Sequence, residues 1–182
     1  ALLRHFGANG LLGCAAELYG PYIDQLDLAG RVTIASMGTE MGAIITFIPP
    51  DEDVIEHCRN AGTTRWQPVY PDADAPYDDE IEVRVDALPP LISKPGHPED
   101  VVEVREVAGR KVDSVFIGSC TNGRFEDMLA AARVLEGRKI APGGVLKIVP
   151  ATDKIWQHCL VEGLIETFKQ AGALVGNAGC AG

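Results

Sequence analysis

The last third of the chain alternates short apolar runs with amphipathic stretches, and this pattern constrains the fold more than any other feature. Apolar runs typical of buried strands lie at residues 114–117, 145–149 and 173–176. Two helices are predicted between them, one over 125–135 and one that begins at a Thr152 or Asp153 cap, has its apolar face at residues 156–168 and is closed by Gly172. Strands joined in this way pair in parallel through right-handed crossovers. The predicted fold class is α/β, a three-layer α/β/α arrangement with a parallel sheet.

The first half of the chain gives shorter patterns of the same mixed kind. Residues 31–37 and 44–48 are apolar between glycines, and they are too short to distinguish a strand from a helical turn. Asp51 is a suitable N-cap for a helix that Gly62 would end. These features predict a smaller α/β portion before the parallel sheet.

A proline-rich, acidic stretch at residues 63–79 separates the two parts of the chain. It is predicted to be a surface connection, because proline lacks the backbone donor that a helix or central strand needs. Residues 81–85 alternate apolar and charged side chains, the period expected of a strand with one face in water. We therefore predict two domains, a partial α/β domain over 1–85 and an α/β domain over 86–182.

Composition limits the partners that such a chain can take. With 182 residues, 46% of them apolar, it can bury a core of its own. A net charge of -10 argues against binding to nucleic acid, and no apolar run approaches the roughly 18 residues of a membrane span. These features predict a cytoplasmic protein. Its five cysteines are expected to be thiols, and some are candidate metal ligands.

Two of these cysteines follow predicted strands. Cys120 comes shortly after the strand at 114–117, Cys180 follows the strand at 173–176, and each lies in a glycine-rich loop. The carboxyl ends of parallel strands meet at one edge, so the two thiols would converge if their strands were neighbours in the sheet. A helix start beside Cys120 would favour its thiolate, as a soft metal site requires. The alternative is that both are small buried apolar residues.

The residues around Cys120 resemble a known motif. The run Val-Phe-Ile-Gly-Ser-Cys-Thr-Asn-Gly-Arg at 115–124 is similar to the first cluster-cysteine motif of the aconitase superfamily, which includes isopropylmalate isomerase and homoaconitase. Residues 31–43 resemble the second substrate-site segment of that family. Further similar segments occur in order at 93–95, 101–102, 126–127, 149–151, 162–163 and 171–173. The resemblance therefore covers nearly the whole chain.

This resemblance implies a domain of the aconitase iron-sulfur type, present in part, and a [4Fe-4S] cluster held by three cysteines. Cys120 would be the first ligand and Cys180 the second, and the third would lie three positions after Cys180, beyond Gly182. The chain is thus expected to be a truncated portion of a larger enzyme, without a complete cluster and inactive alone. Its expected partners are the family's N-terminal and swivel domains or a small subunit.

The resemblance also implies roles for four other residues. Glu40 matches a catalytic glutamate near the open iron, where a carboxylate accepts or relays a proton; the alternative is a glutamate that binds backbone amides at a helix start. Ser36 stands where the family usually has asparagine, which leaves one hydroxyl donor to cluster sulfur instead of two amide donors. Ser119 and Asn122 are further candidate donors to sulfide or thiolate.

The implied activity is that of a hydro-lyase. Aconitate hydratase, which interconverts citrate and isocitrate through cis-aconitate, is the main prediction, favoured by segments 37–43 and 179–182. The alternative is isopropylmalate isomerase, also called 3-isopropylmalate dehydratase, or homoaconitase, and segments 93–95 and 101–102 favour it. Two alternatives from other classes are a noncatalytic structural module and a mononuclear zinc site built from the two cysteines and a histidine.

The other cysteines and the histidines give no comparable signal. Cys58 and Cys159 lie on the apolar faces of predicted helices and are expected to be core residues. Cys14 follows a glycine-rich turn, and its role stays open. The four histidines lie outside the matching motifs and are expected at a surface or interface.

Overall fold

The computed structural model describes residues 1–62 and 64–180. The chain divides into two compact units, an N-terminal unit, Ala1–Ala108, and a C-terminal unit, Gly109–Gly182. This division falls later in the chain than the boundary at 85 and 86 that the sequence suggested. The prolines near that point interrupt secondary structure, but the antiparallel pair of β3 (Leu91–Ser93) and β4 (Val101–Glu103) still belongs to the N-terminal unit.

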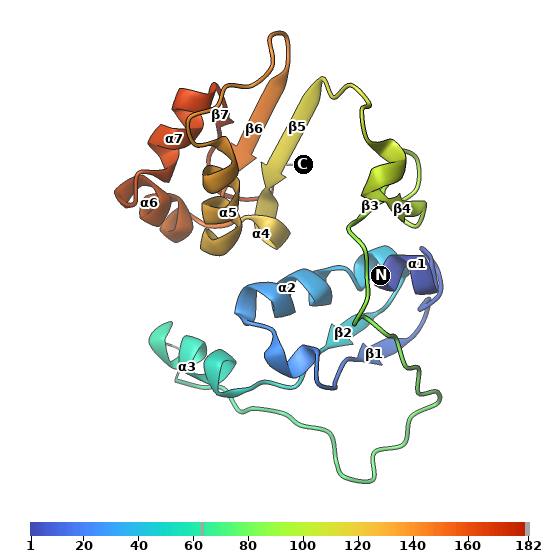
Figure 1. Cartoon of the computed structure of the whole chain (residues 1–182). Coiled ribbons are helices and arrows are strands. Elements are labelled where there is room, and N and C mark those ends of the chain that lie inside the picture. Colours follow the sequence, from blue (N-terminus) through green and yellow to red (C-terminus); the bar gives the residue numbers. More distant parts are fainter. Residues whose placement is uncertain (63, 181–182) are drawn as a thin grey trace. The chain divides into compact units, whose positions relative to one another are not determined.

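The C-terminal unit is built on a parallel sheet, as the alternation of strands and helices predicted. Its strands are β5 (Ser114–Gly118), β6 (Val145–Val149) and β7 (Leu174–Val175), in the spatial order β5-β6-β7 (Figure 1). Gly118 pairs with Val149, and Ile148 pairs with Val175, so all three strands end near one edge of the sheet. The α/β class is confirmed.

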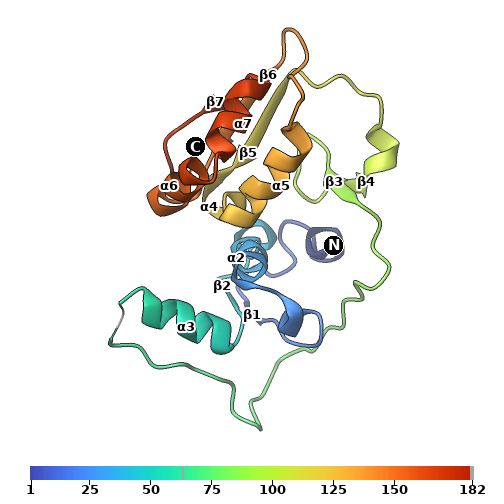
Figure 2. The same ribbon diagram turned by 60° about the vertical axis from the view of Figure 1, so that its left-hand side comes forward.

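Helices α5 (Phe125–Leu135), α6 (Asp153–Val161) and α7 (Leu164–Ala171) connect the strands and contact one another (Figure 2). Successive right-handed crossovers in the order β5-β6-β7 place them on the same face of the sheet. Burial along β6 agrees, because Leu146 and Ile148 are buried while Val145 and Lys147 are exposed. The described part of this unit therefore comprises the sheet and one helical layer of the predicted three-layer arrangement.

The predicted continuous helix over 156–168 is wrong in one respect. The chain turns at Gly163, which has a left-handed φ of 75°, and this residue separates α6 from α7. Glycine adopts that conformation without steric cost. The break allows Leu164 and Phe168 to enter the core while Val161, at the end of α6, stays 81% exposed. A single straight helix would not give both results.

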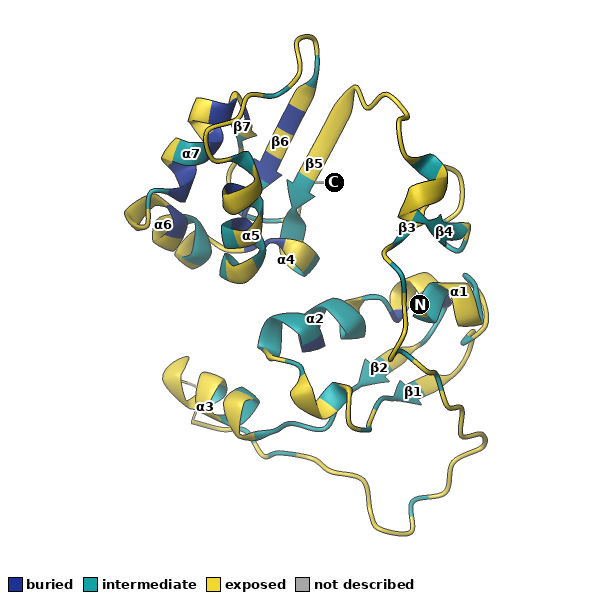
Figure 3. Ribbon diagram, viewed as in Figure 1, coloured by how far each residue is buried: buried dark blue, intermediate teal, exposed yellow. Residues whose placement is uncertain are grey.

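The hydrophobic core of the chain lies mainly between this sheet and its helices. Its fully buried members include Met128 from α5, Ile148 from β6, Cys159 from α6 and Phe168 from α7. Figure 3 shows buried positions, in dark blue, on β6 and on the helices α5, α6 and α7. The core therefore joins all the helices and strands that position the carboxyl edge of the sheet.

The N-terminal unit consists of short elements. They are α1 (Leu2–Phe6), β1 (Ala15–Glu17), η1 (Ile23–Gln25), α2 (Leu28–Ser36), η2 (Thr39–Met41), β2 (Ile45–Phe47), α3 (Glu52–Asn60), β3, β4 and η3 (Val104–Val107). β1 pairs with β2 in parallel. Of the two ambiguous segments in the sequence, 31–37 is mostly helix and 44–48 contains a strand. No described helix has both the length and the apolar character needed to cross a membrane.

The predictions for Asp51 and for residues 81–85 had opposite outcomes. Asp51 caps α3 as predicted, because its Oδ1 accepts a hydrogen bond from the Val54 amide at 3.0 Å. Residues 81–85 form no strand, so that prediction is wrong. Alternation supplies the faces of a strand, but a strand also needs a backbone partner, and none pairs with this segment within the described residues.

Candidate thiolate site

The loop that carries Cys120 turns tightly over the end of β6. Gly118 ends β5 with a φ of 122°, and a Cβ at this position would lie 1.9 Å from the Val149 carbonyl oxygen. Only glycine fits here, because any side chain would overlap the neighbouring backbone. Cys120 follows in the short helix α4 (Ser119–Asn122), and its side chain is exposed.

The other end of this loop is also fixed to β6. The Ala151 amide donates to the Gly123 carbonyl at 2.8 Å, and a Cβ on Gly123 would lie 2.8 Å from the Val149 carbonyl oxygen. Glycines at both ends therefore let the loop lie directly on the carboxyl end of the central strand. The sequence indicated this close approach through the same glycines.

Ser119 and Asn122 lie on either side of Cys120 in this loop. Ser119 has a φ of 80°, and it is the sole non-glycine residue with positive φ in the described part of the chain. Such a conformation costs about 1–3 kcal/mol and persists only where the surroundings impose it. The Ser119 hydroxyl accepts a hydrogen bond from the Thr121 amide at 3.4 Å, and Asn122 is exposed at the end of α4.

Cys180 reaches the same edge of the sheet by a different path from the one predicted. Strands β5 and β7 are not neighbours, because β6 lies between them. The segment after β7 crosses the end of β6 instead. The Gly176 amide donates to the Ile148 carbonyl at 2.9 Å, and the Gly179 amide donates to the Pro150 carbonyl at 3.0 Å. The convergence of the thiols therefore depends on this crossing segment as well as on the strand ends.

The two sulfurs lie within hydrogen-bonding reach of each other. The Cys180 thiol, and after it the Thr121 side chain, lowers the pKa of Cys120 by hydrogen bonding to its thiolate. The same bond and the negative charge of Cys120 raise the pKa of Cys180, because its proton is held in the bond. The hydrogen bond therefore favours the Cys120 thiolate, with Cys180 as the donor. A cation that binds both sulfurs displaces the thiol protons.

These two cysteines are the metal-binding groups that the described residues bring together. No set of three or more His, Cys, Asp or Glu side chains converges on one point in residues 1–62 and 64–180. A tetrahedral zinc site needs about four ligands, and this part of the chain supplies no histidine to the pair. The mononuclear zinc alternative therefore finds no support in the described residues.

The remaining candidate residues, Ser36 and Glu40, belong to the N-terminal unit. Ser36 is the last residue of α2, Glu40 lies in η2, and both side chains are exposed. Within the described residues, the Glu40 carboxylate accepts no hydrogen bond from a helix-end amide, so the helix-capping alternative is not supported. The structure thus brings Cys120, Ser119 and Cys180 together, and it places Ser36 and Glu40 in the other unit.

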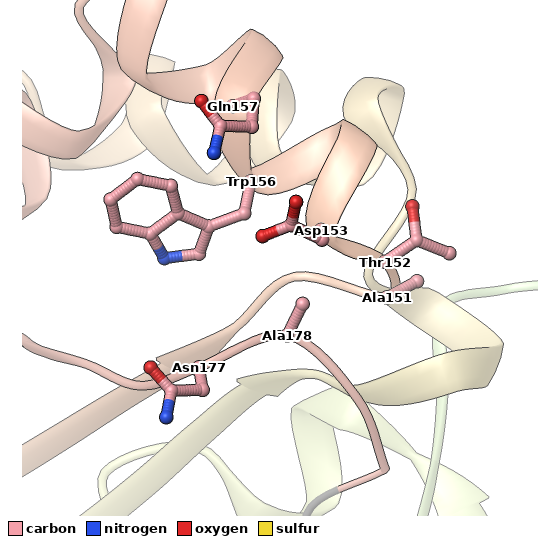
Figure 4. Close-up of a pocket in the computed structure, with 7 residues that line it drawn as sticks. All are labelled: Ala151, Thr152, Asp153, Trp156, Gln157, Asn177 and Ala178. Carbon is pink, nitrogen blue, oxygen red and sulfur yellow. The ribbon is translucent and has the colours of Figure 1, made fainter.

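A pocket of about 340 Å³ lies beside the crossing segment, at the carboxyl edge of the sheet. It is lined by Ala151, Thr152, Asp153, Trp156, Gln157, Asn177 and Ala178 (Figure 4). The nitrogen of the Trp156 ring faces the segment that carries Asn177 and Ala178, and it donates a hydrogen bond to the Gly176 carbonyl at 3.1 Å. The sequence placed Trp156 on the apolar face of a predicted helix, and its hydrogen bond was missed. The available signal was its place one turn after the Thr152 cap, where strand-end loops gather.

The other three cysteines lie apart from this pair. Cys159 is fully buried in the core, as predicted, and burial raises its pKa to about 11. Cys58 is half-buried and lines a mainly apolar pocket of about 320 Å³ beside α3. Cys14 is exposed. The direction of the pKa shift, downward for Cys120 and upward for Cys159, therefore distinguishes the two thiols.

The α/β unit with a cysteine loop on the central strand agrees with the protein class that the motifs suggested. The model of the aconitase family, described as aconitate hydratase, matches residues 1–182, and the chain belongs to this family.

Among individual proteins, the chain is 41% identical over 179 residues to the 3-isopropylmalate dehydratase large subunit of Nitratidesulfovibrio vulgaris, covering 98% of the chain and 43% of that protein. It is 39% identical over 174 residues to large subunit 1 of the same enzyme from Methanopyrus kandleri, covering 96% of the chain and 42% of that protein. It is 42% identical over 180 residues to the homoaconitase large subunit of Thermus thermophilus, covering 98% of the chain and 42% of that protein. The chain therefore spans less than half the length of these relatives.

Proposed function

We propose that this chain provides part of the cluster site of a hydro-lyase, with Cys120 and Cys180 as two of the cysteine ligands of a [4Fe-4S] cluster. The observation that carries the proposal is the pair of exposed thiols at one edge of the sheet, joined by a hydrogen bond that favours the Cys120 thiolate. Thiolates are the ligands that iron-sulfur clusters require, so this donor set fits the group. Membership of the aconitase family supports it further.

The residues around the pair would tune and position the site. When bound, the cluster would supply an iron without a protein ligand, which acts as a Lewis acid toward the substrate's hydroxyl and carboxylate. The Ser119 hydroxyl and the Asn122 amide are candidate hydrogen-bond donors to sulfur beside Cys120. Ser36 is a further candidate donor from the N-terminal unit. Glu40 is the candidate proton acceptor, because an exposed carboxylate is available to take a proton from a substrate carbon.

The relatives guide the proposal for the substrate. They are named 3-isopropylmalate dehydratase and homoaconitase large subunits, so they favour the alternative over the conversion of citrate to isocitrate. We therefore propose a hydroxy acid with two or three carboxylates, of the isopropylmalate type or of the type formed by hydration of homoaconitate, as the substrate. The words "large subunit" also favour a separate small subunit as the partner that completes the enzyme.

Reconstitution with iron and sulfide tests the thiolate ligands. The protein that carries this sequence, extended past Gly182 to include the expected third cysteine, is incubated anaerobically with both, and absorbance near ~400 nm, iron content and sulfide content are measured. The variants Cys120→Ser and Cys180→Ser are expected to lose at least about tenfold in bound cluster, and Cys14→Ser, which changes an exposed cysteine elsewhere, is expected to match the parent. Equal spectra for all three variants, or no absorbance in the parent, would favour the structural module.

A second assay tests the substrate. The protein that carries this sequence, combined with its small-subunit partner, is supplied with cis-aconitate, homoaconitate or isopropylmaleate under anaerobic conditions. Hydration of homoaconitate or isopropylmaleate is expected to be faster than hydration of cis-aconitate. A preference for cis-aconitate would restore the main prediction from the sequence.

A further inference from the structure

The segment that carries Cys180 needs external support to hold its position. Residues 176–180 form no helix or strand, and they include Gly176 and Gly179. Glycine loses more conformational freedom on folding than any other residue, so such a segment is costly to fix. Cys180 nevertheless lies within hydrogen-bonding reach of Cys120. Other contacts must therefore hold the segment.

Two backbone hydrogen bonds and one from a side chain fix the path of this segment. The Gly176 and Gly179 amides bind carbonyls at the end of β6, at 2.9 Å and 3.0 Å. The Gly176 carbonyl accepts a hydrogen bond from Trp156 Nε1 at 3.1 Å. Trp156 thus holds the point at which the chain leaves β7 and begins to cross the sheet edge.

Trp156 is itself well fixed. The Thr152 hydroxyl caps α6 by accepting a hydrogen bond from the Ile155 amide at 3.3 Å, and Trp156 is the next residue of the helix. Its ring packs against the buried core of the C-terminal unit, with Val175 of β7 also packed there. An indole with an apolar body in the core and one polar atom at the surface has little freedom to move. Its N–H is therefore a stable reference point for Gly176.

We propose that Trp156 is a positioning residue that holds Cys180 opposite Cys120. It acts through the Gly176 carbonyl, and its importance for the enzyme rests on the proposed cluster function. The effect on the two thiols is independent of that function. Loss of the indole N–H would free the start of the crossing segment and widen the range of positions open to the Cys180 sulfur, while the core under the ring stays filled.

A dithiol probe measures this effect without any cluster. Phenylarsine oxide forms two As–S bonds with a pair of neighbouring thiols, and its oxygen leaves as water with the two thiol protons. The measurement uses the 182-residue chain in reduced form, its Trp156→Phe variant, and Trp66→Phe as the matched control at the other tryptophan. A Cys120→Ser sample gives the background from single thiols.

Trp156→Phe is expected to weaken phenylarsine oxide binding about two- to fivefold, the change that loss of one hydrogen bond at a partly exposed position produces. Trp66→Phe is expected to bind as the parent does. Circular dichroism and thermal unfolding show whether each variant keeps its fold. Should Trp156→Phe unfold, replacement of Trp156 by 3-benzothienylalanine, which exchanges the N–H for sulfur at nearly the same shape, provides the same comparison with the core filled.

The two proposals fail in different ways. Unchanged phenylarsine oxide affinity in a folded variant that lacks the indole N–H would overturn the role of Trp156. A two- to fivefold loss of phenylarsine oxide affinity, together with no iron-sulfur absorbance in the protein extended past Gly182, would leave Trp156 as the positioning residue of a thiol pair and overturn the cluster function. Weakened binding of both the probe and the cluster supports both proposals.

Discussion

The C-terminal unit and the N-terminal unit differ in what holds them together. Of the buried apolar side chains among the described residues, Met41 lies in the N-terminal unit and all the others lie in the C-terminal unit. The N-terminal unit has instead a buried Arg31, which forms an ion pair with Asp51 at 2.5 Å, and tyrosine–glutamate hydrogen bonds. Apolar burial gives a stability that depends little on charge, whereas polar contacts respond to pH and to the loss of a single partner.

The largest expected effect lies in the apolar core. Phe168 is fully buried, so Phe168→Ala removes its contacts and leaves a cavity. We expect the free energy of unfolding of the C-terminal unit to fall by about 3–5 kcal/mol. Urea unfolding followed by tryptophan fluorescence in a Trp66→Phe background, where Trp156 is the remaining tryptophan, measures it. Val161→Ala is the control, since Val161 is 81% exposed and its loss is expected to cost less than about 0.5 kcal/mol.

The next largest expected effect concerns the polar contacts that hold the N-terminal unit together. Arg31 donates to the Leu26 and Pro49 carbonyls at 3.0 Å and 3.2 Å in addition to its ion pair with Asp51. Arg31→Ala leaves these acceptors without a partner, and we expect a loss of about 2 kcal/mol in the N-terminal unit.

Hydrogen exchange of the amides in α2 and β2 measures this loss. The control is Arg59→Ala, because the ion pair of Arg59 with Glu52 is well exposed and should contribute about 0–0.5 kcal/mol. Equal effects of the two substitutions would contradict the contrast between buried and exposed charge.

A pH titration sharpens the comparison within the core. Burial raises the pKa of Cys159 from 9.0 to about 11, so the folded C-terminal unit keeps a proton that the unfolded chain releases. This contribution to stability is complete below about pH 9 and is lost as the pH rises toward 11. Urea unfolding at pH 8 and pH 10.5 should show a larger decrease in the parent than in Cys159→Ala. The same slope in both proteins would contradict the assignment to Cys159.

The smallest expected effect concerns the long connection in the N-terminal unit, the segment between α3 and β3 that is described over residues 64–90. The Tyr77 hydroxyl donates to Glu17 Oε2 at 2.7 Å, and the Tyr19 hydroxyl donates to Glu80. Tyr77→Phe removes one of these anchors, and we expect faster proteolytic cleavage within residues 64–90 with little change in the unfolding midpoint. Limited proteolysis with mass spectrometry locates the cuts. Tyr70→Phe, at an exposed tyrosine of the same connection, should be cut at the parent's rate.

Local chemistry explains which parts of the fold the sequence predicted. The apolar runs gave all three strands of the C-terminal sheet, and Asp51 and Thr152 gave two helix starts, because capping depends on residues three positions apart. The alternation at residues 81–85 gave a wrong strand prediction, because strand pairing also requires a backbone partner elsewhere in the chain. The turn at Gly163 was missed because the apolar stripe continues on both sides of it.

The candidate site also divides into features that local sequence predicted and features that depend on residues far apart in the chain. Cys120 and Cys180 were found from glycine-rich loops at strand ends, and the structure brings their sulfurs together. The position of β6 between β5 and β7 was not foreseen, because strand order is a property of the whole sheet. The hydrogen bond between Trp156 and Gly176 joins residues far apart in sequence, and nothing in the local pattern around either residue predicts it.

The crossing of β6 also limits how the chain tolerates changes in length. Each added residue extends a backbone by up to about 3.3–3.6 Å, and the path from Val175 to Cys180 is fixed at Gly176 and Gly179. One inserted or deleted residue there would shift the second sulfur by more than a bond length and separate it from the first. The long connection before residue 90, by comparison, has room for such changes. Natural variants of this protein should therefore differ in length in that connection while the count from Val175 to Cys180 stays constant.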